Sequence, residues 1–266
     1  MNELPEITEA KKRVMQVVEI MILADYDLKR IIKKYLDKLT DISMKYDSLG
    51  KQFTFYYNTE LYREINAILS DMKMELFSLI NHRSNQADFI ATNEEKEDKV
   101  HPFMYVDYKG GNVEGRIARY ISNFTKEAEV YIAIGLANRL SKDSVQESYL
   151  SNMKKPYKSQ EFIDALKEGG YEAERIKSKG LSYGKYIPAF VGLKMLEQDS
   201  IYKAYNYSLQ DTWVKGGNVI GWYTVRGSNY PCPDICDPMV GVIHPINEPY
   251  YGYHPRCVCP MIPVHK

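Results

Sequence analysis

Apolar side chains recur at helical spacing through the first part of the chain. Between residues 28 and 49 they alternate at intervals of four and three positions, and lysine or aspartate occupies many of the positions between them. The members of this series are Leu28, Ile32, Tyr35, Leu39, Ile42, Tyr46 and Leu49. A heptad repeat of this kind predicts a long amphipathic helix, and Gly50 is a suitable helix stop.

A second apolar stripe predicts another long helix, which begins near Asn58 or Thr59. Its members are Leu61, Ile65, Ile68, Met72, Leu76 and Leu79. Two long helices joined by a short connection form a helical hairpin, so we expect the two stripes to pack against each other.

Helical signals continue as far as about residue 214. Apolar spacing after the turn at 108–112 predicts a third long helix that reaches about residue 140. Ser141 and Ser159 suit the N-caps of two short helices, because a serine hydroxyl accepts a hydrogen bond from a free backbone N–H at a helix start. A further helix is expected over about 192–214, after Pro188.

The pattern changes character after the last of these helices. Residues 218–226 are rich in β-branched and aromatic side chains, which is typical of a strand, and 239–245 and 256–264 are two shorter strand candidates. We therefore expect an α+β protein that is mainly helical. It has a long-helix hairpin in an N-terminal body, followed by a small β-rich module that carries cysteine and histidine.

The change of character after Gly111 predicts a division of the chain into two regions. Residues 1–111 form the helical hairpin, which we expect to be an interaction element. Residues 112–266 form the second region, and its β-rich cysteine segment covers about 216–266.

The charge balance argues against two functional classes. The chain has 35 Lys and Arg and 35 Asp and Glu, so its formal net charge is zero. A nucleic-acid coat protein or a polybasic membrane binder carries an excess of positive charge. No apolar run approaches the roughly 18 residues of a membrane span, and the first residues lack the basic-then-apolar order of a signal peptide. We expect no membrane contact and synthesis in a cytoplasm.

All four cysteines fall in the last 35 residues of the 266-residue chain, beside a histidine. They are Cys232, Cys236, Cys257 and Cys259, and the histidine is His254. Zinc takes four such ligands in a tetrahedron, and two ligand pairs about twenty residues apart are a usual way to supply them. We expect these residues to lie together and to join the strand that contains Trp222 to the end of the chain.

Three other chemistries remain open for the same residues. Disulfides would have to cross between the two pairs, because a C-x-C pair is too short to close on itself without strain. A reducing cytoplasm disfavours such bonds, which leaves packed free thiols as a further alternative. A catalytic thiol would need His254 as its base, and the chain lacks the H-x-E…P-C-x-x-C pattern of the zinc deaminases.

The C-terminal residues resemble the Mu F-like minor head proteins of tailed phages. The matching positions are Ala204 and Asn206 in the last helix, Trp222 in the first strand, the turn of Cys232 and Cys236, Gly241 and Pro245 in the next strand, and His254, Pro255, Cys257 and Cys259 at the end. The helix at 113–124 also resembles the family. The chain departs from the family pattern in its cysteine turn, which is one residue longer, and at Val258, where the family usually has arginine.

The resemblance implies a structural role in the phage head and no enzymatic activity. Such proteins are present in few copies, associate with the portal protein during procapsid assembly, and take part in DNA packaging or ejection. The implied partners are the portal, capsid and scaffold proteins, with DNA contacted indirectly and no small-molecule substrate. The implied location is the capsid interior or portal vertex of the virion, and the host cytoplasm during assembly. The resemblance implies no cofactor chemistry, and structural zinc, which the cysteine spacing suggests, is the one candidate cofactor.

Two functions of other classes compete with this expectation. Mu F-like modules can be joined to toxin domains such as ADP-ribosyltransferases, and the pairs Glu95/Glu97 and Glu172/Glu174 imitate the E-x-E of those enzymes. Both pairs lie in charged stretches typical of solvated surface. A zinc-ribbon nucleic-acid binder is the other alternative, but no basic helix accompanies the cysteines.

Overall fold

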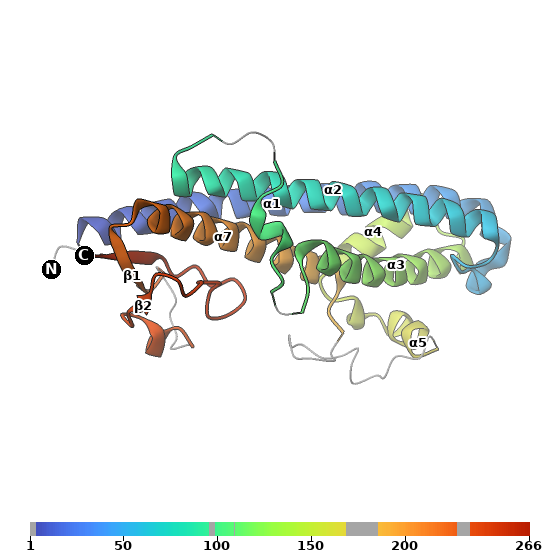
Figure 1. Cartoon of the computed structure of the whole chain (residues 1–266). Coiled ribbons are helices and arrows are strands. Elements are labelled where there is room, and N and C mark those ends of the chain that lie inside the picture. Colours follow the sequence, from blue (N-terminus) through green and yellow to red (C-terminus); the bar gives the residue numbers. More distant parts are fainter. Residues whose placement is uncertain (1–3, 96–98, 109, 169–185, 228–234) are drawn as a thin grey trace. The chain divides into compact units, whose positions relative to one another are not determined.

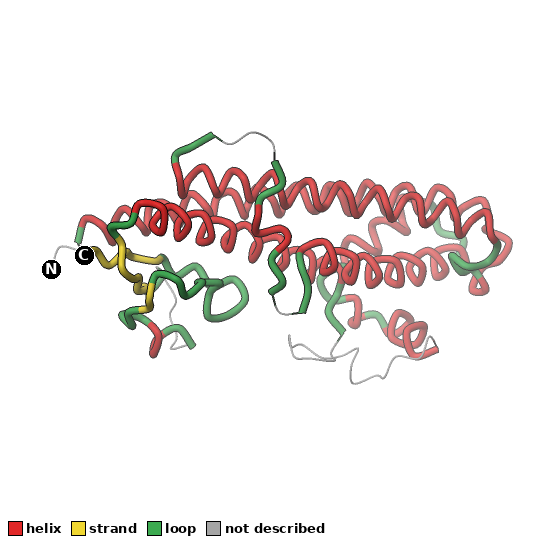
Figure 2. Tube along the Cα trace, viewed as in Figure 1, coloured by secondary structure: helices red, strands yellow, loops and turns green. Residues whose placement is uncertain are grey.

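The structure is a computed structural model that describes residues 4–95, 99–108, 110–168, 186–227 and 235–266. Its helices are α1 (Pro5–Ser43), α2 (Thr59–Thr92), α3 (Val113–Ala137), α4 (Lys142–Asn152), α5 (Gln160–Glu168) and α7 (Ala189–Gly216). Its strands are β1 (Val219–Thr224), β2 (His244–Pro245) and β3 (Met261–His265), which lie together near the C-terminus (Figures 1 and 2). The expected fold class, α+β and mainly helical with a small β-rich C-terminal segment, is confirmed.

The predicted helix ends are largely confirmed, with one correction. The α-helical part of α1 ends at Ser43 rather than at Gly50, and the 3₁₀ segment η1 (Met44–Gln52) follows it. The hydroxyls of Thr40 and Ser43 donate to backbone carbonyls four residues earlier, at 2.8 and 2.7 Å. Such bonds bend a helix, and Gly50, with φ of 52°, completes the change of direction.

Side-chain caps start three of the helices. The side-chain oxygen Oδ1 of Asn58 accepts from the N–H of Leu61 at 2.8 Å, which fixes the start of α2. Ser141 and Ser159 accept from the backbone at the starts of α4 and α5, as expected.

The chain forms two compact units. The sheet unit comprises residues 1–26, 78–113 and 195–266, and the helical unit comprises 27–77 and 114–194. Helices α1, α2 and α7 each contribute residues to both units. Each unit takes residues from both sides of position 111, and the predicted division there stays a prediction about independent folding.

The sheet is antiparallel, with strand order β2-β1-β3. Trp222 in β1 is opposite His244 on one side and Pro263 on the other. Two predicted strands are shorter than expected. The segment 239–243 lies outside the sheet because Gly241 takes a φ of 79°, and a 3₁₀ turn (Asp237–Met239) precedes it. β3 begins only after Pro260, whose ring leaves no N–H for a ladder bond.

Trp222 lies in the core of the sheet unit. Its side chain is 1% exposed and stacks on the His244 ring at 4.2 Å between centroids. Its indole N–H donates to the carbonyl of Glu248 at 3.0 Å. Leu209 belongs to the same apolar cluster, and Ala204 is fully buried. The remaining members come from α1, α2, α7, the C-terminal loops and β3: Val14, Val17, Met21, Ala24, Ala87, Ala91, Ile201, Tyr202, Tyr205, Cys236, Tyr250, Cys257, Cys259 and Met261.

The helical unit is built from helix-on-helix packing. The predicted seam and stripe residues Leu28, Ile32, Tyr35, Leu39, Leu61, Ile65, Met72 and Leu76 are buried. Two glycines allow close approach, since an added Cβ would overlap Val145 at Gly135 and the Tyr120 ring at Gly192. Across the part of the chain that the structure describes, no helix has the length and apolar character that a membrane crossing requires.

Candidate functional site: a cysteine and histidine cluster

Three of the predicted ligands come together in the sheet unit. The ligand atoms of Cys236, His254 and Cys257 all lie within 4.8 Å of one another, and these residues could hold a metal ion. Cys236 directly precedes the 3₁₀ turn, whereas His254 and Cys257 close a backbone turn ahead of β3, with the N–H of Cys257 donating to the His254 carbonyl at 3.1 Å. The two sulfurs therefore approach from segments about twenty residues apart.

The spacing of the two thiols fits a tetrahedral metal. The Cys236 and Cys257 sulfurs are 3.7 Å apart. Two thiolates bound at the usual Zn–S distance of roughly 2.3 Å are separated by roughly 3.8 Å along a tetrahedral edge. Both thiols are buried, and no disulfide joins one to the other in this structure. The donor set of two sulfurs and one imidazole is one that zinc prefers.

The ring of His254 is oriented by its own turn. Its Nδ1 lies 2.8 Å from the carbonyl oxygen of Pro255. A carbonyl oxygen only accepts, so Nδ1 carries the proton and Nε2 keeps its lone pair. Histidines that bind metals commonly donate their other ring N–H to a carbonyl or carboxylate. The hydrogen bond thus prepares one nitrogen of His254 for a metal.

Neighbouring groups favour the thiolate form of Cys257. A hydrogen bond with Cys259 lowers the pKa of Cys257 to about 4, and a further bond from the Tyr250 hydroxyl, at 3.3 Å, acts in the same direction. The same contact with Cys257, together with burial, raises the pKa of Cys259. Metal ligands must be deprotonated, so Cys257 is the member of this pair suited to bind metal.

The other predicted residues fall around the cluster. Cys259 is buried in the same core but is not part of the three-residue group, and its carbonyl accepts from the Tyr202 hydroxyl at 2.8 Å. Asn206 is fully buried on α7. Pro245 belongs to β2, and Pro255 is the second residue of the His254 turn. Outside the described residues lie Cys232, Glu97, Glu172 and Glu174.

The polar residues that support the cluster carry no recognisable pattern in the sequence. Tyr250 has no motif around it, and only its position between the cysteine pairs points to it. Asp199 and Lys203 are buried in spite of their charges and lie four residues apart on α7, at 2.9 Å between Nζ and Oδ2. An Asp–Lys pair at this spacing normally indicates an exposed helix face, so the sequence alone would place them in solvent.

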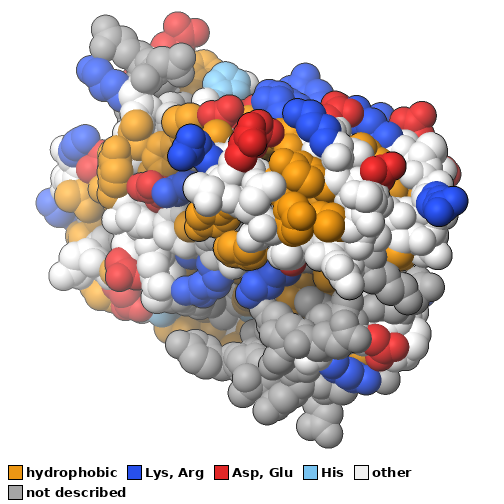
Figure 3. Space-filling model, turned by 90° about the vertical axis from the view of Figure 1, so that its right-hand side faces the viewer, with side chains coloured by type: hydrophobic (Ala, Val, Ile, Leu, Met, Phe, Trp, Pro, Cys, Tyr) orange, Lys and Arg blue, Asp and Glu red, His pale blue; other side chains and the backbone are white. Residues whose placement is uncertain are grey.

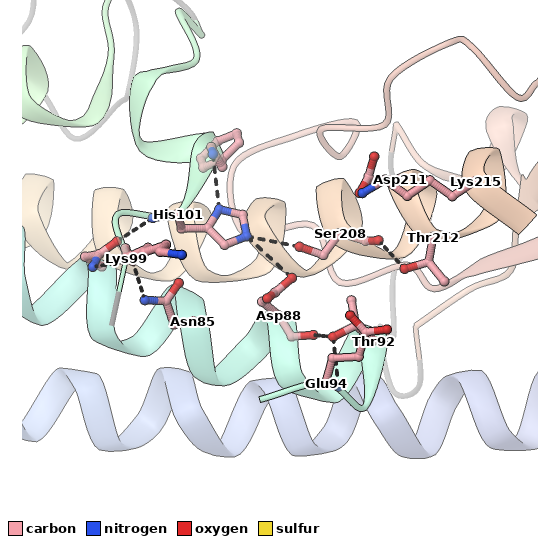
Figure 4. A network of polar contacts seen from close by, with 12 residues as sticks. Asn85, Asp88, Thr92, Glu94, Lys99, His101, Ser208, Asp211, Thr212 and Lys215 are labelled. Atoms are coloured by element: carbon pink, nitrogen blue, oxygen red, sulfur yellow. Dashed lines mark hydrogen bonds and ion pairs between the residues drawn. The ribbon is translucent and has the colours of Figure 1, made fainter. Parts of the chain in front are cut away.

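A second polar region lies around His101 (Figure 4). Asn85, Asp88, Lys99, Tyr207, Ser208, Asp211 and Lys215 help to line a cavity of about 510 Å³ beside it. The ring nitrogen Nε2 of His101 lies 3.0 Å from the hydroxyl of Ser208 and 3.8 Å from the carboxylate of Asp88. Ser208, His101 and Asp88 are the residue types of the catalytic triad of a serine hydrolase.

The geometry argues against catalysis by this triad. Nδ1 of His101 accepts from the backbone N–H of Phe103 at 3.1 Å, so the proton resides on Nε2. Ser208 and Asp88 both face this same protonated nitrogen, whereas a working triad has the acid on one ring nitrogen and the nucleophile on the other. His101 therefore donates to Ser208 and cannot remove its proton. The network holds α2, α7 and the segment at 101 together.

Comparison with known proteins adds no family assignment: no family model, curated protein or solved structure matches the chain.

Proposed function

We propose that this chain is a minor head protein of a tailed phage or prophage, which binds the portal or inner capsid during procapsid assembly and has no enzymatic activity. One observation carries the proposal. Trp222, Cys236, Cys257 and Cys259, which carry the Mu F-like resemblance, lie in one apolar core. A resemblance spread over some sixty residues thus corresponds to one compact structural element.

The helical unit offers the surface that we propose for the portal. At the turn between α1 and α2, Tyr46 and Tyr57 make an edge contact at 5.9 Å, and Tyr56 and Tyr62 stack at 5.2 Å. We call these four residues the tyrosine tip. Tyrosine combines a broad apolar surface with a hydroxyl and is enriched at protein interfaces.

The surroundings of the tyrosine tip fit a protein partner. Tyr56 is 69% exposed and Tyr57 is 51% exposed. Figure 3 shows the face that carries the turn between α1 and α2. Hydrophobic side chains, a class that includes tyrosine in this figure, gather there among charged side chains of both signs. A surface that bound nucleic acid through its phosphates would need an excess of Lys and Arg. The mixed charge favours a polypeptide surface.

Portal binding is tested with the full chain and the portal protein of the same phage. We expect the wild-type protein to co-purify with portal oligomers, and the variant Tyr56→Ala/Tyr57→Ala to lose most of that binding. Tyr105→Ala is the matched control, because Tyr105 is a comparably exposed tyrosine, at 64%, in the sheet unit. Retention on DNA at low salt without any portal binding would instead favour the nucleic-acid alternative.

We propose that the cluster of Cys236, His254 and Cys257 holds a structural zinc ion. The sulfur separation of 3.7 Å and the oriented His254 ring support this. A segment of about forty residues with a short sheet has little core of its own, and small modules of this kind are commonly stabilised by a metal. Cys232 and Cys259 are the two candidates for a fourth ligand.

Metal analysis and a thiol count decide the chemistry. Protein purified without chelator should contain about one zinc per chain, and Cys236→Ser should abolish it. Cys232→Ser and Cys259→Ser, examined separately, identify the fourth ligand. A protein with no zinc and four reactive thiols after denaturation would contradict the zinc proposal, and one with no zinc and no reactive thiols would indicate disulfides.

A further inference from the structure

The turn that carries His254 has an unusual backbone. Pro255 and Arg256 are its central residues, and Arg256 has a φ of 61°. Proline followed by a residue of positive φ is the arrangement of a type II turn, in which glycine or asparagine is usual at the second position. An arginine there costs about 1 kcal/mol or more and persists only where other contacts impose it.

A buried carboxylate on α7 makes such a contact. Oδ1 of Asp199 accepts the backbone N–H of Arg256 at 2.7 Å. Its other oxygen, Oδ2, lies 2.9 Å from the ammonium of Lys203, and both side chains are almost completely buried. Lys203 lies in turn over the ring of Tyr108, 4.5 Å from its centroid. The carboxylate is therefore held in place and its charge is compensated.

The same peptide group also orients the histidine. The N–H that donates to Asp199 and the carbonyl that accepts from His254 belong to the single peptide between Pro255 and Arg256. In a trans peptide these two groups point in opposite directions, so fixing the N–H fixes the carbonyl as well. The carbonyl holds Nδ1–H of His254 and leaves Nε2 for a metal.

We infer that Asp199 is a positioning residue of the metal site: it holds the Pro255–Arg256 peptide in the orientation that directs His254 at the metal. Lys203, 2.9 Å from the other carboxylate oxygen, holds Asp199 in place. The inference rests on the proposed metal site and is independent of portal binding. Outer-shell partners of metal ligands typically contribute 10- to 100-fold to metal affinity.

Two double variants test whether the oxygen of residue 199 that accepts from the Arg256 N–H is required for metal binding. Asp199→Leu/Lys203→Met removes the ion pair and the acceptor together, replacing them with apolar side chains of similar size, a change that folds usually tolerate. Asp199→Asn/Lys203→Met removes the same charges but keeps an oxygen that can accept from Arg256. Asp211→Ala is the surface control, because Asp211 and Lys215 form an exposed pair at the same spacing on the same helix.

The measurement is a titration of the metal-free full chain with Co²⁺, followed by the thiolate and d–d absorption bands and by competition with zinc. We expect the leucine variant to bind roughly 10- to 100-fold more weakly than wild type, with altered d–d bands as the imidazole is lost. The asparagine variant and Asp211→Ala should bind within about threefold of wild type. Circular dichroism and an unfolding curve of each metal-free protein separate weaker binding from loss of fold.

Equal affinity in the leucine and asparagine variants would overturn the inference while leaving the metal site intact. A wild-type chain that binds no Co²⁺ would overturn both, without bearing on portal binding. If the leucine variant does not fold, Asp199→Ala/Lys203→Met takes its place in the same comparison.

Discussion

The two units of this protein each bury a carboxylate, and the two carboxylates have different partners. Asp199 in the sheet unit is paired with the ammonium of Lys203 and with one backbone N–H. Among the residues that the structure describes, Glu127 in the helical unit has only neutral donors: the hydroxyls of Tyr149 and Tyr186, at 3.1 and 2.5 Å, and the N–H of Ala189, at 2.8 Å. Burial raises the pKa of Glu127 to about 7 in spite of these bonds.

The difference shows that neutral hydrogen bonds alone do not offset the desolvation of a buried carboxylate, whereas a cation in contact compensates its charge directly. Three neutral donors reach both oxygens of the Glu127 carboxylate, yet its pKa remains high because desolvation outweighs these bonds. The Asp199 carboxylate has a cation in contact, which offsets its charge directly. We therefore expect the helical unit to respond to pH near neutrality through Glu127.

The largest expected effect concerns the core of the sheet unit. Trp222→Ala should lower the free energy of unfolding by about 3–5 kcal/mol, because a fully buried aromatic leaves a large cavity. Chemical denaturation measures this, with Ile220→Ala on the same strand as control, since Ile220 is 51% exposed. An unchanged denaturation midpoint for Trp222→Ala would show that the sheet contributes nothing to the stability of the unit.

The next effect tests the buried acid of the helical unit. Since the folded pKa of Glu127 is about 7 and its ordinary value 4.5, its contribution is fully present below pH 4.5 and is lost as pH rises through 7. A tenfold change in proton affinity corresponds to about 1.4 kcal/mol, so the loss should reach about 3 kcal/mol. Glu127→Gln should remove this pH dependence and be more stable than wild type at pH 8.

Unfolding curves from pH 4 to pH 9 measure the effect. Asp164→Asn is a suitable control, because Asp164 is an exposed acid on α5 in the same unit. If wild type and Glu127→Gln vary with pH in parallel, then Glu127 is not the group that titrates.

A smaller expected effect on stability tests the close approach of α3 and α7 at Gly192. A methyl group at Gly192 would overlap the ring of Tyr120, so Gly192→Ala should destabilise by about 1–3 kcal/mol in spite of the better helix propensity of alanine. Adding Tyr120→Leu should recover part of the loss. Full additivity of the two changes in a double-mutant cycle would mean that the two residues are not in contact.

The smallest effect contrasts an exposed ion pair with the buried pair of the sheet unit. Lys142 reaches Asp37 and Asp41 at 2.8 and 2.6 Å on the surface of the helical unit. Exposed pairs typically contribute under about 1 kcal/mol, so Lys142→Met should change stability only slightly, and less still in high salt. Lys203→Met alone should cost several times more, because it leaves the buried Asp199 charge without a partner. Thermal melts at two salt concentrations distinguish the two cases.

Local pattern was enough to predict most of the secondary structure. The heptad series from Leu28 predicted the last part of α1. Asn58, Ser141 and Ser159 marked helix starts, because capping depends on residues within a single turn of helix. The change to β-branched residues at 218 predicted β1. The short strands were predicted too long, since Gly241 and Pro260 act on backbone geometry that residue preference does not express.

The sequence by itself determined that the cysteines and His254 are close together along the chain, and from this we predicted one site, because clustered cysteine and histidine at such spacing commonly bind zinc. Only the tertiary structure decided which of them meet, at 3.7 Å between the Cys236 and Cys257 sulfurs. It alone also placed Asp199 and Lys203 inside the protein. The physical reason is that burial of a charge depends on partners distant in the chain: the contact between Asp199 and Arg256 spans 57 residues, and no local pattern records it.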